Sequence, residues 1–86
     1  MPEISRFLGM VIYMYYNDHA PPHFHVRYGQ AKAIIGIDTL AVLRGRLPPR
    51  ASGLIVEWAA AHRGELHEIW RRARDHADLL SIEPLE

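Results

Sequence analysis

The sequence predicts a single α+β domain, in which a small antiparallel sheet of about four strands is followed by one kinked or two consecutive helices packed on one face. Two observations predict this class. The first half of the chain contains short segments rich in β-branched and aromatic residues, separated by turn residues. In the second half, apolar residues recur at steps of three and four, as on one face of a helix. With 86 residues the chain can bury one modest core, so we expect residues 1–86 to form one domain.

The first predicted strand is the run FLGMVIYMYY, residues 7–16, which is apolar on both faces and is therefore expected to be buried. Asn17 and Asp18 then begin a turn. Pro21 and Pro22 keep this connection open to about residue 23, because proline cannot donate to a strand ladder.

The second predicted strand, FHVRYG, alternates cleanly between apolar and polar residues. Successive side chains of a strand point to opposite faces, so the apolar set is expected in the core. That set is Phe24, Val26 and Tyr28. The polar set on the opposite face is His23, His25 and Arg27.

Two further strands are predicted at residues 31–38 and 40–47. In the latter, Leu43 and Leu47 are expected on one face and Arg44 and Arg46 on the other. A proline pair at 48–49 then ends the sheet. The short connections favour an antiparallel meander over a crossover sheet.

The helical periodicity covers residues 51–62 and, after Gly64, residues 66–77. Gly64 is expected to kink or divide the helix. Trp58 and Trp70 are expected to pack against the sheet, one from each half. The closing LLSIEPLE, residues 79–86, is expected to return as an extended segment along a sheet edge.

Composition limits the function classes. Ten Lys plus Arg balance ten Asp plus Glu, which argues against a protein that holds nucleic acid mainly by bulk electrostatics. The basic residues are nearly all arginines, and Arg44, Arg46 and Arg50 are candidates for contacts with phosphate or an acidic partner. The chain has no cysteine, which excludes disulfides and thiolate chemistry. The N-terminal run shows no basic leader and is too short to span a bilayer, so a cytoplasmic location without membrane contact is expected.

Three of the six histidines fall within seven positions, in DHAPPHFHVRYG. One interpretation is a metal site formed by His19, His23 and His25, with Asp18 beside them, because imidazole is a common ligand for transition metals. We expect no cofactor, since a third ligand lies across a proline-bearing loop. A simpler interpretation makes the segment a turn followed by the polar face of an amphipathic strand.

A third interpretation is acid-base chemistry. If the first two strands pair antiparallel, Tyr13 lies near His25, Tyr15 near His23, and Val11 near Arg27. Such a face could cleave RNA without a metal. One of the two histidines would remove the 2′-hydroxyl proton, the other or Tyr13 would protonate the leaving oxygen, and Arg27 would stabilise the phosphorane.

The opening MPEISRFLGMVIYMYYNDHAPPHFHVRYG resembles that of small bacterial proteins of the domain-of-unknown-function family four-one-six-zero, whose hallmark has the form xMYYNDHxPPHFHxxYG. The segments LRGRLPPRA, VEWAAAHRGEL and IEPL are similar too, whereas RARDHADLLS departs from a more usual glycine-containing link. The hallmark falls on Tyr15, Tyr16, Asn17, Asp18, His19, Pro21, Pro22, His23, Phe24, His25, Tyr28 and Gly29.

The resemblance implies a genomic context, because members of this family are often encoded beside another small protein in pairs regarded as type II toxin-antitoxin systems. The leading hypothesis is therefore the toxin of such a module, acting on RNA as a metal-independent ribonuclease. The alternatives are a non-catalytic antitoxin or DNA-binding transcriptional regulator, and a histidine-based metal-binding module. The expected partners are a cognate small antitoxin or toxin, RNA or DNA, and a second copy of the chain.

Overall fold

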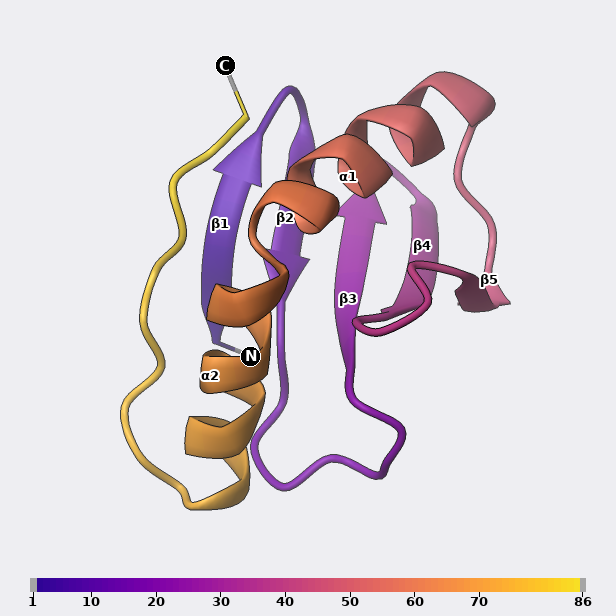
Figure 1. The fold of residues 1–86 in the computed structure, drawn as a ribbon. Helices are drawn as coiled ribbons and strands as arrows, with labels where there is room; N and C mark the ends of the chain where they lie inside the picture. Colours follow the sequence, from indigo (N-terminus) through magenta and orange to yellow (C-terminus); the bar gives the residue numbers. More distant parts are fainter. Residues whose placement is uncertain (1, 86) are drawn as a thin grey trace.

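A computed structural model describes residues 2–85 as a five-stranded antiparallel sheet followed by two helices (Figure 1). The strands follow one another in the sheet in chain order, as a meander. They are β1 (Glu3–Phe7), β2 (Met10–Tyr13), β3 (His23–Tyr28), β4 (Ala31–Gly36) and β5 (Val42–Gly45), and the helices are α1 (Pro49–Ala61) and α2 (Arg63–Arg74). The predicted α+β class is confirmed, with one strand more than the predicted number.

The additional strand arises because residues 7–16 do not form one strand. Leu8 and Gly9 have φ angles of 49° and 81°, and they connect β1 to β2 as a two-residue turn between Phe7 and Met10. Positive φ at both central residues is the pattern of a type I′ hairpin, which matches the twist of the flanking strands. The prediction of one continuous strand was wrong here, because the residues on both sides of Gly9 are apolar and resemble an uninterrupted buried strand.

The register between β2 and β3 pairs Tyr13 with His25 and Val11 with Arg27, which confirms this part of the prediction. β3 then pairs with β4 through a two-residue turn that begins at Gly29, with φ 61°. Because β3 lies at the centre of the sheet and pairs with both β2 and β4, it fixes the side chains of the candidate site.

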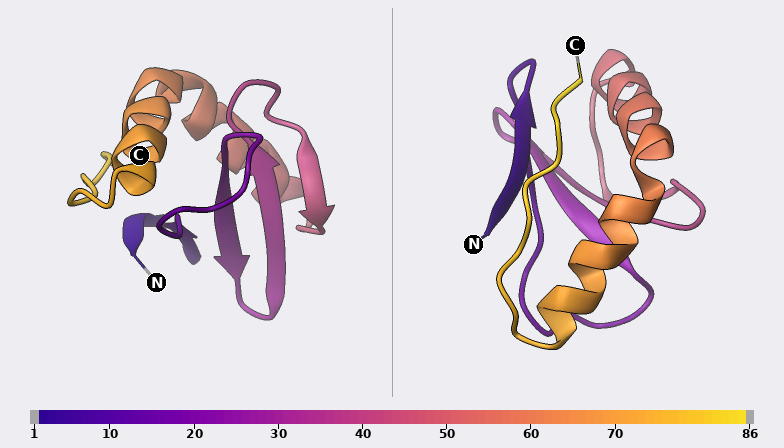
Figure 2. Two further views of the ribbon diagram at one scale, coloured as in Figure 1. Left: turned by 90° about the horizontal axis from the view of Figure 1, so that it is seen from below. Right: turned by 60° about the vertical axis from the view of Figure 1, so that its left-hand side comes forward.

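The two helices cover one face of the sheet and leave the opposite face uncovered, as Figures 1 and 2 show. Trp58 of α1 is fully buried and contacts Phe7 and Phe24 at ring-centroid distances of 5.4 and 6.0 Å. Trp70 of α2 is also buried, so the predicted role of both tryptophans is confirmed. No helix within residues 2–85 is long and apolar enough to cross a lipid bilayer.

The division between the helices falls at His62 and not at the predicted Gly64. His62 has φ −123° and ψ 24°, and its backbone N–H donates to Ala59 O at the end of α1. Its carbonyl oxygen accepts a hydrogen bond from Leu66 N, which is the first backbone bond of α2. The His62 imidazole contacts Glu65 in the first turn of α2. Gly64 lies inside α2, where the helix tolerates it at a cost of about 1 kcal/mol relative to alanine.

The segment after α2 runs back beside β1, as expected from the sequence (Figure 2). Ile82 N donates to Ile4 O at 2.8 Å, and Trp58 Nε1 donates to Glu83 O at 2.8 Å. The Ile82 side chain is buried in the core. This segment therefore joins the β1 edge to α1.

Tyr28, which was predicted in the core, and Leu43, which was predicted on one strand face with Leu47, are both exposed. Tyr28 keeps the helix-side orientation of β3 but lies at the strand end and is 39% exposed. Leu43 is 47% exposed because β5 is a short edge strand whose pairing with β4 is interrupted between Ile34 and Ile35. Leu47, beyond the strand, is buried.

Candidate functional site

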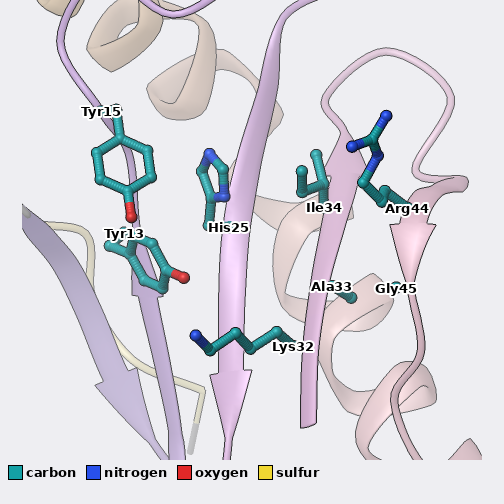
Figure 3. Close-up of a pocket in the computed structure, with 8 residues that line it drawn as sticks. All are labelled: Tyr13, Tyr15, His25, Lys32, Ala33, Ile34, Arg44 and Gly45. Atoms are coloured by element: carbon teal, nitrogen blue, oxygen red, sulfur yellow. The ribbon is translucent and has the colours of Figure 1, made fainter.

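The uncovered face of the sheet, called the open face below, carries a depression of about 280 Å³ over β2 to β5 (Figure 3). The residues that line it are Tyr13, Tyr15, His25, Lys32, Ala33, Ile34, Arg44 and Gly45. Tyr13, His25, Ile34 and Arg44 come from one row across four paired strands. The sheet register therefore gathers phenol, imidazole and guanidinium groups on one surface.

His25 stands at the centre of this row. Its ring stacks on Tyr13 with centroids 5.1 Å apart and planes inclined by 15°, and it makes a T-shaped contact with the Tyr15 ring at a centroid distance of 4.8 Å. Figure 3 shows the two tyrosines on one side of His25 and Ile34 with Arg44 on the other. The predicted pairing of Tyr13 with His25 is present, whereas Tyr15 packs against His25 and shows no ring contact with His23 among the described residues.

The carboxylate of Asp18 joins the two histidines. Oδ2 lies 3.1 Å from His25 Nε2 and 2.9 Å from His23 Nε2, while Oδ1 accepts the backbone N–H of His19 at 2.9 Å. Burial by itself raises the pKa of Asp18, but the hydrogen bonds from His25, the His19 backbone and His23 outweigh it and hold the pKa below its usual value. Asp18 is therefore an ionised acceptor at neutral pH.

Helix α2 holds the loop that carries Asp18. Asn17, in the left-handed conformation with φ 54°, donates its backbone N–H to Ala73 O at 3.1 Å. Asparagine tolerates the left-handed backbone conformation better than most residues. The rings of the neighbouring Tyr16 and of His76 stack with their centroids 6.1 Å apart. The position of Asp18 thus depends on contacts of its neighbours with Ala73, near the end of α2, and with His76, which follows the helix.

His23 is buried at 7% exposure, and both of its ring nitrogens have partners. Nδ1 lies 2.7 Å from Pro21 O, Nε2 faces Asp18, and the ring lies 5.1 Å from that of Trp70. Both ring nitrogens therefore face oxygen atoms of the loop that carries Asp18, and His23 is not among the residues that line the depression. Its role as general base stays a prediction.

Tyr13 is 5% exposed although its strand face is open, because the rings of Tyr15 and His25 cover it. Burial, together with the neighbouring Tyr15 phenol, raises the pKa of Tyr13 above its usual value, and the charge of Arg27 opposes this only in part. The Tyr13 hydroxyl therefore keeps its proton and can donate it in a hydrogen bond.

Cationic side chains surround the row. Arg27 pairs across the sheet with Lys32, whose side chain crosses in front of β3 with its amine toward Tyr13 (Figure 3). Arg44 lines the opposite side of the depression. Arg46 and Arg50 are exposed but lie elsewhere, Arg50 on the helix side beside Leu8, so the predicted arginine group is divided.

His19 is exposed and contributes only its backbone N–H to the site. The third group beside the two histidines is Asp18, which was expected to be a turn residue or a neighbour of a metal site. Its signal in the sequence was an acidic residue five positions before His23, at the start of a turn able to fold back.

The fold and the site define a small α+β protein with a polar, histidine-bearing sheet face. A family model described as a domain of unknown function (DUF4160) matches residues 9–71, from the β1–β2 turn into α2. The chain belongs to this family, as its resemblance indicated. The matched range contains every residue that lines the depression and all of the Asp18–His23–His25 group. Comparison with curated proteins and with solved structures finds no match.

Proposed function

We propose that this chain is the toxin of a type II toxin-antitoxin module and that it cleaves RNA at the open face. One observation carries the proposal. His25 is held between the Asp18 carboxylate, 3.1 Å away, and the stacked Tyr13 ring, on a surface that also presents Lys32 and Arg44. An oriented imidazole beside a proton donor and cations is a set of groups suited to phosphate transesterification.

In the proposed reaction, Asp18 accepts the Nε2–H of His25, which leaves Nδ1 with its lone pair. No hydrogen bond within residues 2–85 occupies that nitrogen. Nδ1 takes the proton of the ribose 2′-hydroxyl, and the 2′-oxygen attacks the adjacent phosphorus. The bond from phosphorus to the 5′-oxygen breaks, giving a 2′,3′-cyclic phosphate, and the leaving oxygen takes a proton from Tyr13. Solvent then returns a proton to Tyr13 and removes one from His25.

The surrounding residues have binding roles in this proposal. Lys32 and Arg44 contact phosphate oxygens and stabilise charge in the transition state. Tyr15, at 43% exposure, offers a ring face or edge on which a base can stack. His23 acts as a positioning residue through Asp18.

The biological role is tested by paired expression in a bacterial host. Expression of this chain alone is expected to arrest growth, and co-expression of the protein encoded beside it is expected to restore growth. The opposite result, arrest by the neighbour and rescue by this chain, would assign the antitoxin role to this chain.

The chemistry is tested with purified protein and a single-stranded RNA. His25→Ala is expected to lower the cleavage rate by about 10²- to 10⁴-fold, the usual contribution of a general base. His67→Ala is the matched control, because His67 pairs with Asp38 at the molecular surface away from the depression. A substrate with one 2′-deoxyribose at the cleaved position should resist cleavage there. Equal rates for the two variants would contradict the proposal.

Phosphate binding at the open face has its own charge-matched test. Arg44→Ala is expected to weaken RNA binding and to lower the slope of log affinity against log salt concentration by about 0.7, the value for one phosphate contact on a single strand. Arg50→Ala removes the same charge from the helix side and is expected to leave both quantities unchanged. Equal losses in the two variants would indicate non-specific attraction.

A further inference from the structure

We propose that Asp18, His23 and His25 form a binding site for one divalent transition-metal ion of the Zn²⁺ class, with Asp18 Oδ2 and the two Nε2 atoms as ligands. These three atoms lie within 4.8 Å of one another. The site goes beyond the proposed function, because the ion would bind whether or not the chain acts on RNA.

The two distances from Asp18 Oδ2 to the imidazole nitrogens are those of neighbouring ligands around one ion. Asp18 Oδ2 is 2.9 Å from His23 Nε2 and 3.1 Å from His25 Nε2. Two ligands bonded to a metal at about 2.05 Å are about 2.9 Å apart in an octahedral arrangement and about 3.3 Å apart in a tetrahedral one. Both distances fall within this range, so Asp18 Oδ2 stands at the spacing of a neighbouring ligand from each of the two imidazole nitrogens.

The hydrogen bond of His23 to Pro21 supplies the second argument. A carbonyl oxygen only accepts, so Nδ1, 2.7 Å from Pro21 O, carries the proton. Nε2 is then the ring nitrogen directed at Asp18 Oδ2, 2.9 Å away, and it is the nitrogen of His23 that can act as a ligand. An ion bound there would also reach Asp18 Oδ2, which lies 3.1 Å from His25 Nε2.

The outer contacts of the site aim its ligands as in known metal sites, where a ligating histidine donates its other N–H to a backbone carbonyl or carboxylate. His23 makes such a bond to Pro21 O. The Asp18 carboxylate is fixed through Oδ1 by the His19 backbone, which leaves Oδ2 directed at the imidazoles. Both supports come from the loop that α2 holds in place.

The donor set selects the class of ion. Two imidazole nitrogens and one carboxylate oxygen suit Zn²⁺, Co²⁺, Ni²⁺ or Cu²⁺, whereas Mg²⁺ and Ca²⁺ prefer oxygen ligands. The side chain of Asp18 is 21% exposed and that of His25 13% exposed, so the site is reachable from solvent. Three protein ligands leave at least one coordination position for water or a substrate.

An ion on His25 Nε2 has a consequence for the proposed reaction. A neutral imidazole that binds a metal through Nε2 carries its proton on Nδ1. The nitrogen assigned as the base would then have no lone pair. Metal binding and base catalysis by Nδ1 therefore exclude each other.

Binding is tested on protein purified without a histidine tag and treated with chelator. Titration with ZnCl₂ by calorimetry, and with CoCl₂ by visible absorption, is expected to show one ion per chain, while MgCl₂ gives no binding. Asp18→Ala and His25→Ala are expected to lower Zn²⁺ affinity at least 100-fold. His19→Ala is the matched control and should bind as the unaltered chain does, because the His19 side chain is exposed and outside the group. Far-UV circular dichroism and the melting temperature establish that each variant is folded.

Three results would overturn the site: no Zn²⁺ bound by the unaltered chain, equal affinity for Mg²⁺, or equal losses in His19→Ala and Asp18→Ala. A Zn²⁺ stoichiometry of one with loss confined to the ligand variants supports it. Cleavage assays on the same samples separate this inference from the proposed function. Binding with cleavage only in the metal-free form supports both, whereas binding without cleavage in either form leaves the site established and refutes the ribonuclease.

Discussion

Tyr13 shows how neighbours on an otherwise exposed surface change the chemistry of one side chain. Tyr15 and His25 cover its ring, and burial followed by the Tyr15 phenol raises its pKa. Because the folded chain holds the phenolic proton more tightly than the unfolded chain, Tyr13 contributes stability below the unfolded value near 10. This contribution is lost as the pH rises through the folded value.

We expect the phenolate absorbance of the folded chain to include a component above pH 10 that belongs to Tyr13. Tyr13→Phe should remove that component, and Tyr16→Phe, which alters an exposed ring, should retain it. Ultraviolet titration of the two variants and of the unaltered chain provides the measurement. If Tyr13→Phe leaves the high-pH component in place, burial does not control this phenol.

At the scale of elements, Gly45 determines how β5 lies against β4. Its φ is +84°, and a Cβ added there would lie 2.2 Å from Lys32 O. An alanine at this position must separate the two strands or adopt an unfavourable backbone conformation. The neighbouring Arg44 depends on the same strand for its place at the depression.

Gly45→Ala is expected to lower the free energy of unfolding by about 1–3 kcal/mol and to weaken RNA binding through displacement of Arg44. Gly53→Ala provides the control, since its added Cβ meets no atom within 4 Å in α1. There the change should stabilise the helix by about 0.5–1 kcal/mol. Urea denaturation of both variants gives the comparison, and a destabilised Gly53→Ala with an unchanged Gly45→Ala would contradict it.

The sequence patterns predicted those elements whose periodicity is local. The alternation of residues 23–28 placed His25 on the open face, and the expected antiparallel pairing of the first two predicted strands placed Tyr13 beside it. The hairpin at Leu8 and Gly9 was missed because apolar residues on both sides continue a strand-like run. Asp18 was not assigned to the site, because its position depends on the loop path and on the distant hydrogen bond from Asn17 to Ala73.

For the whole molecule, the C-terminal segment completes the core. Ile82 is 4% exposed and belongs to the same cluster as Trp58 and the inward side chains of the sheet. Its backbone N–H donates to Ile4 O at 2.8 Å. The segment therefore contributes both apolar burial and a backbone contact to β1, although it forms no helix or strand.

Ile82→Ala is expected to lower the free energy of unfolding by about 2–5 kcal/mol, the usual range for removing a buried isoleucine side chain to the β-carbon. Leu80→Ala, two positions away and 46% exposed, should change it by less than about 1 kcal/mol. Thermal and urea denaturation monitored by tryptophan fluorescence give both values. Similar losses in the two variants would mean that the segment is not anchored through Ile82.

The contact between Ile82 and Ile4 also bears on which edge of the sheet is open to pairing. Residues 79–85 shield the β1 side of the sheet, whereas the opposite edge is β5, a strand with four exposed residues. An exposed edge strand is the part of a sheet to which a further strand can pair. The two edges of this sheet therefore differ: the C-terminal segment lies beside β1, and β5 is exposed.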